Sequence, residues 1–291
     1  MKYHLFFEQS GTWRDVLRSH GHTAIDYDIV NEYGKTDRKI DLFAEIEREY
    51  AFVTGTWSPP MGDARQTVFT KMRPDRDFII AFFPCTYFTD LNELQFKGYG
   101  YKGHKFGSVH DTTCAEMILQ IHARADEQLR HYKLFNKLCF VCQELKIPLI
   151  VENPRGAHDR NYVKDYSPFR PAWCDADRSL FGDDKVKATL YWAINFEMRE
   201  QFQMFVQVAK TKRVQRLRGK ERSEMTPEYA DNFYKRFLAG VGVQCGKTMK
   251  THYMTFVKER EKETPAEYSP CENCERDCTT SCRHHCDHEG E

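Results

Sequence analysis

A cysteine and a glutamate, each at the end of an apolar run, are the residues of this sequence best suited to chemistry. The run IIAFF leads into Pro84 and Cys85, and the run LIV leads into Glu152. A thiolate at Cys85 would be a nucleophile able to attack a substrate carbon. A carboxyl group at the end of a buried strand is suited to donate a proton near neutral pH, which is the role expected of Glu152. Each residue alone also fits a structural role, as a buried thiol or a carboxylate that caps a turn.

The segment FFEQSGTWRD, which begins at Phe6, has the form of a turn between a strand and a helix. Gly11 would let the backbone of such a turn approach a cofactor closely. Asp28 ends the next apolar segment, where an acidic side chain can bind the hydroxyl groups of a ribose. With a single glycine, the turn alone equally fits an ordinary connection between a strand and a helix. The turn, Asp28, Cys85 and Glu152 follow one another in this order along the chain. Together they indicate a function far more specifically than any one of them does.

Strands that alternate with helices are expected to position these residues. We predict strands at 2–7, 23–29, 77–83 and 148–152, and helices at 13–19, 41–50 and 112–146. Residues 51–76 and 153–185 read as irregular, further strands are plausible at 189–196 and 202–208, and Thr226 caps a helix that runs to about residue 239. The pattern is typical of an α/β fold with a mainly parallel, doubly wound sheet covered on both faces.

Taken in order, these features resemble the motifs of DNA cytosine-5 methyltransferases, in particular the short phage-type members without a long target-recognition domain. FEQSGTW is similar to the family's Phe-x-Gly-x-Gly motif, FFPCTYFT to its Pro-Pro-Cys motif and VENPRG to its Glu-Asn-Val motif. The segments KATLYWAINF and RSEMTPEYADNF resemble the tail of the short members. The resemblance covers the chain from about residue 3 to residue 238 and implies a Rossmann-like methyltransferase fold.

The resemblance implies S-adenosylmethionine as methyl donor and a cytosine flipped out of DNA as substrate. Cys85 would add to C6 of the base, and Glu152 would hold N3 and the exocyclic amine, so that C5 takes the methyl group. The residues expected to bind the donor are Phe7, Gly11, Trp13, Asp28, Asp41 and Pro84.

The sequence departs from the family pattern at two places in the expected donor pocket. Glu8 and Gln9 replace the first glycine, and Phe83 replaces the first proline. These departures leave two other functions open. One is a non-catalytic nucleic-acid-binding protein on a degenerate methyltransferase fold. The other is a related enzyme that modifies cytosine with another group or acts on free nucleotides.

Charge restricts how the chain can bind DNA. Lys and Arg together number 43, as do Asp and Glu, so binding requires a local basic patch. Residues 210–222, KTKRVQRLRGKER, form the densest basic run, which fits either phosphate binding or a solvated surface. Its QRLR resembles the family's Gln-x-Arg-x-Arg motif, which implies that Arg218 contacts the reacting base. Only a few residues separate Arg222 from Thr226, so no target-recognition domain fits there.

The C-terminal segment is rich in cysteine and histidine and predicts a metal site. Cys271, Cys274, Cys278 and Cys282, with Cys286 and three histidines nearby, suit tetrahedral zinc. An iron–sulfur cluster and a metal-free tail are the alternatives. We therefore expect a methyltransferase-like domain over residues 1–258 and a charged linker with a Cys/His-rich tail over residues 259–291.

The composition is that of a folded protein with a sizeable core. Of its 291 residues, 41% are hydrophobic and 14% are aromatic. No apolar stretch of about 18 residues is present and the N-terminus lacks the pattern of a signal peptide, so we expect a cytoplasmic protein without a membrane partner. In a reducing compartment, 11 cysteines favour thiols, catalysis or metal binding over disulfides.

Overall fold

The computed structural model describes residues 1–58, 66–89, 114–156, 159–201, 211–213 and 224–240. The chain divides into two compact units, Met1–Thr251 and His252–Glu291, and the second lies entirely outside the described residues. The expected boundary between residues 258 and 259 and the expected strand at 202–208 lie outside them as well. No helix within the described ranges is long and apolar enough to cross a membrane.

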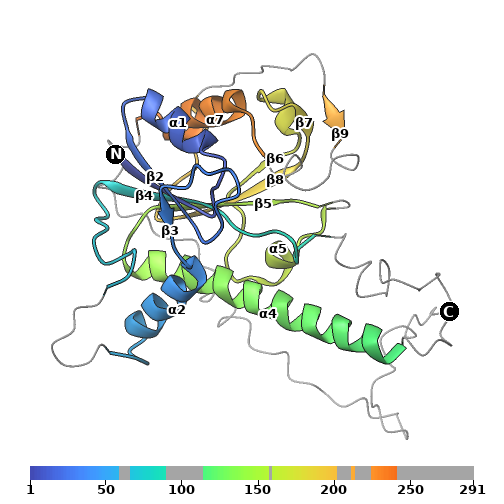
Figure 1. Cartoon of the computed structure of the whole chain (residues 1–291). Coiled ribbons are helices and arrows are strands. Elements are labelled where there is room, and N and C mark those ends of the chain that lie inside the picture. The colour runs from blue at the N-terminus through green and yellow to red at the C-terminus, as the bar shows by residue number, and fades with distance from the viewer. Residues whose placement is uncertain (59–65, 90–113, 157–158, 202–210, 214–223, 241–291) are drawn as a thin grey trace, which may run out of the picture. The chain divides into compact units, whose positions relative to one another are not determined.

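A seven-stranded sheet forms the centre of the described part (Figure 1). Its strands lie in the order β3 (Arg38–Lys39), β2 (Thr23–Asp28), β1 (Lys2–Phe6), β4 (Asp77–Phe82), β5 (Leu149–Pro154), β8 (Thr189–Ile194) and β6 (Trp173–Asp175). The strands from β3 to β5 pair in parallel, whereas β8 is antiparallel to both β5 and β6. The prediction of an α/β fold with a mostly parallel sheet is confirmed.

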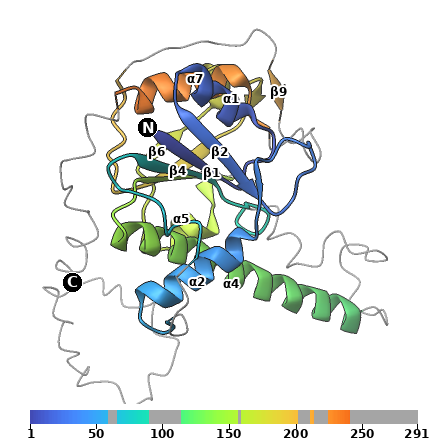
Figure 2. The ribbon, with the colours of Figure 1, turned by 60° about the vertical axis from the view of Figure 1, so that its left-hand side comes forward.

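Helices cover both faces of this sheet (Figures 1 and 2). One face carries α1 (Thr12–Ser19) and α7 (Pro227–Phe233), which continues as a π-helix over Tyr234–Leu238. The other face carries α2 (Leu42–Val53), α4 (Cys114–Glu144) and α5 (Tyr162–Tyr166).

Alternating burial explains why the central strands read as continuous apolar runs. In β4, Ile79 and Ala81 pack into the core beside α2 and α4, whereas Phe78 and Ile80 pack into the core beside α1 and α7. A strand buried on both faces needs apolar residues at every position. The doubly wound arrangement follows from this pattern.

The expectation that residues 153–185 are irregular is wrong in part. This stretch contains α5, strand β6 and a 3₁₀ helix over Arg178–Leu180. These elements are too short to show a periodic sequence pattern, and distant residues hold them in place. The carboxylate of Asp175 on β6, for example, accepts hydrogen bonds from the Tyr229 hydroxyl at 2.7 Å and from Nη2 of Arg236 at 2.8 Å.

Candidate active site

One pocket at the carboxyl-terminal edge of the central strands collects most of the predicted site residues. Its volume is about 620 Å³, which lies within the range of small-molecule sites. The predicted residues that line it are Phe7, Trp13, Asp28, Asp41, Pro84, Cys85 and Glu152. They come from β2 and β5 and from the segments that follow β1, β3 and β4, so residues far apart in the sequence share one cavity.

Cys85 and Glu152 reach this pocket from neighbouring parallel strands. Phe82, at the end of β4, lies opposite Glu152 on β5, and Pro84 and Cys85 follow directly. Cys85 is half-buried and Glu152 is buried. Because both line the same cavity, a bound molecule could contact the thiol and the carboxyl group together.

The asparagine of the Glu-Asn-Pro sequence joins the two strand ends. The side-chain amide of Asn153 donates a hydrogen bond of 3.0 Å to the carbonyl of Phe83, two residues before Cys85. The amide of Asn161 donates in turn to the side-chain oxygen of Asn153 and to the carbonyl of Pro154, both at 2.8 Å. Phe83, Asn153 and Asn161 are all buried. Their hydrogen bonds therefore fix the loop of Cys85 against the strand of Glu152. The sequence analysis assigned no role to either asparagine.

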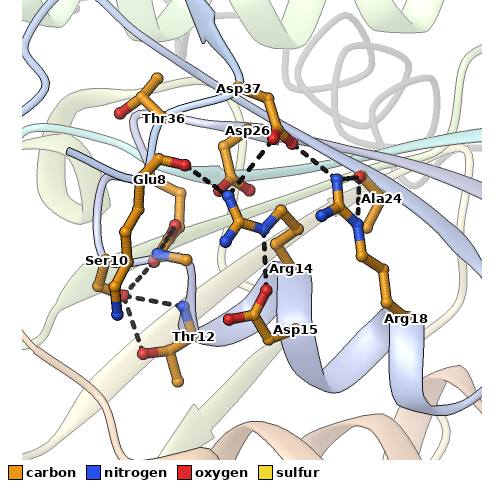
Figure 3. Close-up of polar contacts among 12 residues, drawn as sticks. Glu8, Ser10, Thr12, Arg14, Asp15, Arg18, Ala24, Asp26, Thr36 and Asp37 are labelled. Carbon is orange, nitrogen blue, oxygen red and sulfur yellow. Dashed lines mark hydrogen bonds and ion pairs between the residues drawn. The ribbon is translucent and has the colours of Figure 1, made fainter. Parts of the chain in front are cut away.

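Glu8 gives the turn between β1 and α1 an internal carboxylate (Figure 3). Its Oε2 accepts a 2.8 Å hydrogen bond from the backbone N–H of Gly11, and the Ser10 hydroxyl donates to Oε1. Burial raises the pKa of Glu8, and these hydrogen bonds oppose the shift. Glu8 therefore places a buried carboxyl group at the start of α1, where its oxygen accepts the N–H of Gly11.

Gly11, predicted to bind the donor, is not among the residues that line the pocket. It lies in the turn before α1 and has a left-handed φ of 75°. A Cβ atom at this position would lie 2.7 Å from Nη2 of Arg14. The backbone angle therefore favours glycine here, and any other side chain would have to displace the Arg14 guanidinium.

Beside the turn, Arg14 and Arg18 of α1 contact carboxyl groups from the neighbouring segments (Figure 3). Nη1 of Arg14 lies 3.0 Å from Oδ2 of Asp26, and Nη2 of Arg18 lies 2.8 Å from Oδ2 of Asp37. Asp26 is completely buried, and burial together with the charge of Glu8 raises its pKa to about 8. The turn between β1 and α1 is therefore held against a cluster of arginine and aspartate side chains, of which Asp26 is completely buried.

Asp28 and Asp41 both line the pocket, and both use an oxygen to order the backbone. Oδ1 of Asp28 accepts a hydrogen bond of 2.7 Å from the N–H of Val30, and burial raises the pKa of Asp28. Oδ1 of Asp41 accepts from the N–H groups of Phe43 and Ala44, at 3.0 and 3.2 Å, and so caps the N-terminus of α2.

Aromatic rings form the walls of the pocket beside the turn between β1 and α1. Phe7 adopts the left-handed φ of 61°, which is strained for an aromatic residue. Its ring packs against Phe43 and Phe83, with centroid distances of 5.6 and 5.3 Å. On the other side, the ring of Trp13 lies 5.2 Å from that of Phe82. Such rings suit a planar heterocycle.

His131 of α4 closes the pocket beside these rings. Its centroid lies 5.0 Å from that of Phe43 and 4.6 Å from that of Tyr87. Burial lowers the pKa of His131. The imidazole therefore favours its neutral form.

Two cations that the sequence analysis did not single out lie near Glu152. Nη1 of the fully buried Arg178 is 3.8 Å from Oε1 of Glu152, and the same guanidinium forms an ion pair with Asp183. Lys187, just before β8, lines the pocket itself. In the sequence, only the pair of lysines at Lys185 and Lys187, directly before an apolar strand, points to this position, and no known motif contains the pair.

The remaining predicted site residues lie outside the described ranges. Arg218 falls in residues 214–223, and Cys271, Cys274, Cys278 and Cys282 fall in residues 241–291. The described part of the basic run includes Lys212, whose Nζ lies 3.1 Å from Oδ2 of Asp184. Among the described residues, no group of three or more His, Cys, Asp or Glu side chains is arranged to hold a metal ion.

Comparison with known proteins gives no family assignment. No model of a protein family matches the chain, and no curated protein matches it.

Proposed function

We propose that the chain is a DNA cytosine C5-methyltransferase that uses S-adenosylmethionine and has a Rossmann-like methyltransferase fold. The observation that carries the proposal is the shared pocket of Cys85, Glu152 and the turn after β1. The short motifs along the sequence support the same function. Arg218, from the basic run, would contact the base.

The chemistry of the pocket fits this donor. The Glu8 carboxylate takes up the N–H of Gly11 at the start of α1, so a ligand phosphate would meet an anion there. The same region carries the carboxylates of Asp28 and Asp41 and the aromatic walls described above. S-adenosylmethionine has no phosphate and bears a positive sulfonium group. Phe7 and Trp13 would flank the donor, Asp28 would bind its ribose, and Asp41 and Pro84 would border it.

When bound, the donor would supply an activated methyl group. Cys85, as thiolate, would form a bond to C6 of the cytosine ring. Glu152 would hold a proton at N3, so that the electron pair displaced from the C5–C6 double bond makes C5 nucleophilic. After C5 has taken the methyl group, water would accept the C5 proton, the C5–C6 double bond would re-form, the Cys85 thiolate would leave C6, and N3 would return its proton to Glu152. The chain thus returns to its starting state.

Mass spectrometry of nucleosides tests the proposal directly. DNA incubated with the full chain and methyl-labelled S-adenosylmethionine should yield labelled 5-methylcytosine. Cys85→Ser should yield none, whereas Cys174→Ser, which alters an exposed cysteine outside the pocket, should match the wild type. A protein that binds DNA but neither binds the donor nor modifies cytosine would instead be the non-catalytic binding protein.

For the C-terminal segment, we propose a zinc site formed by Cys271, Cys274, Cys278 and Cys282. Metal analysis of the purified chain should find about one zinc ion per molecule. Removal of residues 265–291 should abolish zinc binding and spare the fold of the N-terminal unit. Protein that contains neither zinc nor iron, with these thiols freely titratable, would exclude the site.

A further inference from the structure

Lys187 is fixed beside the ends of the two strands that carry Cys85 and Glu152. Its carbonyl accepts a 3.1 Å hydrogen bond from the N–H of Arg178, and the next carbonyl, of Ala188, accepts one of 3.0 Å from the N–H of Arg155. Arg155 directly follows β5, which contains Glu152. Both hydrogen bonds hold the backbone in register with the carboxyl-terminal edge of the sheet.

The side chain of Lys187 lines the same pocket as Cys85 and Glu152. Among the described residues that line this pocket, it is the lone lysine or arginine, and several carboxylates line the donor end. Lys187 therefore shares one cavity with the thiol and the carboxyl group that the proposed reaction uses.

The charges around Lys187 come from three segments. Burial and the Arg178 guanidinium lower its pKa. Glu152 on β5, Cys85 after β4, and Asp183 after the 3₁₀ helix act in the opposite direction and favour the protonated amine. Interaction between two charges is reciprocal, so an ammonium that Cys85 stabilises also favours the thiolate of Cys85 over the thiol.

We infer that Lys187 is a positioning residue that holds Cys85 as a reactive thiolate beside Glu152. The inference deepens the proposed function, because it assigns the group that prepares the nucleophile. The net change is transfer of the thiol proton to the amine or to solvent, and no other bond changes. The alternative is that Lys187 only neutralises Glu152 and leaves Cys85 unaffected.

Alkylation of Cys85 by iodoacetamide distinguishes these roles in the full chain, without DNA or donor. Iodoacetamide is uncharged, so its approach does not depend on the charge of residue 187. The rate at Cys85 is followed by peptide mass spectrometry between pH 6 and pH 10, with the exposed Cys174 as an internal reference. For Lys187→Met, the rate at pH 7 should fall about tenfold, which corresponds to a change of about one unit in the thiol pKa.

The pH profile and two further variants separate charge from structure. At pH 10 the rates of wild type and Lys187→Met should converge, because both thiols are then ionised. Lys187→Arg should restore most of the rate at pH 7. Lys212→Met removes a lysine that contacts Asp184 outside the pocket and should behave as the wild type.

A loss of rate by the same factor at every pH, or an unchanged rate at pH 7, would overturn the inference. The wild-type protein alone also tests the inference. A pH profile of Cys85 alkylation with a midpoint no lower than about 8.5, the pKa of an ordinary thiol, would overturn it. Because the measurement involves neither DNA nor donor, the charge effect can be present even if the nucleoside assay disproves the methyltransferase function.

Discussion

Nη1 of Arg14 on α1 and Oδ2 of Asp26 on β2 lie 3.0 Å apart beside the turn of Glu8. Arg14 favours the ionised form of Asp26, yet the pKa of Asp26 is raised to about 8. Burial is the largest cause, and the nearby Glu8 carboxylate adds to it. Desolvation of the carboxylate therefore outweighs its attraction to Arg14.

The raised pKa of Asp26 should make the free energy of unfolding depend on pH. Between its ordinary pKa of 3.8 and about 8, the unfolded chain has lost the Asp26 proton while the folded chain retains it. Unfolding then releases a proton, so this group lowers the free energy of unfolding as pH rises through that window, by up to about 1.4 kcal/mol per pH unit. Asp26→Asn should remove this contribution and gain stability relative to wild type between pH 4 and pH 8.

Urea denaturation at several pH values measures that difference. Asp15→Asn is the matched control, because Asp15 is an exposed carboxylate that also contacts Arg14, at 2.9 Å. It should keep the pH dependence of the wild type. A constant difference between Asp26→Asn and wild type across the window would refute the raised pKa.

Gly11→Ala should lower the stability of the protein more than the same substitution at another glycine with positive φ, because Gly11 lies in the turn between β1 and α1. The backbone strain alone costs about 1 kcal/mol or more. Gly21 has a similar φ of 80°, but an added Cβ there meets nothing within 4 Å, so Gly21→Ala measures strain without a clash. Gly11→Ala should lose more stability and weaken S-adenosylmethionine binding, because Arg14 must move. Thermal unfolding and calorimetric titration check both effects, and equal losses in the two variants would contradict the packing argument.

Cys85→Ser should abolish methyl transfer while donor affinity stays within a few-fold of wild type. A hydroxyl without an adjacent base is a far poorer nucleophile than a thiolate. Turnover is measured with labelled donor, and binding by calorimetry. DNA that contains 5-fluorocytosine should trap the wild-type chain covalently and leave the variant free. Turnover near the wild-type rate would remove Cys85 from the mechanism.

Glu152→Gln should lower kcat by about 10²–10⁴-fold, the usual loss when general acid–base help is removed. Glu224→Gln is a useful comparison, because Glu224 lines the same pocket and accepts a 2.7 Å hydrogen bond from the hydroxyl of Tyr33. That change should affect the KM for the donor more than kcat. Unchanged kinetics for Glu152→Gln would make the carboxylate a structural group.

The basic run should account for much of the salt dependence of DNA binding. Neutralising Lys210, Lys212, Arg213 and Lys220 removes up to four phosphate contacts, so the slope of log K against log salt should flatten by up to about three units. Lys212→Met alone should change the slope by less than the roughly 0.9 of a full contact, because Asp184 lies 3.1 Å from Nζ of Lys212 and competes with phosphate. Filter binding at several salt concentrations measures the slopes. A quadruple variant with the wild-type slope would place the DNA path elsewhere.

The sheet and the meeting of Cys85 with Glu152 could be predicted because both depend on local sequence. Strands buried on both faces must be apolar throughout, and parallel strands bring their carboxyl ends to one edge. The internal role of Glu8 was not predictable from the sequence. Its bonds to Ser10 and Gly11 depend on the exact shape of the turn.

Features held by distant partners were also missed. Strand β6 is three residues long and depends on Tyr229 and Arg236. The helix at 112–146 was predicted correctly, and α4 spans Cys114–Glu144. Its apolar spacing nevertheless overstates its burial, because Ile118 and Leu129 are exposed. Periodicity shows that a helix has an apolar side, but it cannot show how far the sheet extends beneath it.

The hydrogen bond from the Gly11 N–H to Glu8 also affects how the pocket exchanges one bound ligand for the next. A turn whose N–H groups await a ligand becomes ordered only on binding, and the entropy lost then weakens affinity. Here the N–H of Gly11 is bonded within the chain, so that entropy is lost once, during folding. Empty and filled pockets should share one turn conformation. If the pocket binds S-adenosylmethionine as proposed, spent donor would leave and fresh donor would enter without a cycle of melting and reordering of this turn.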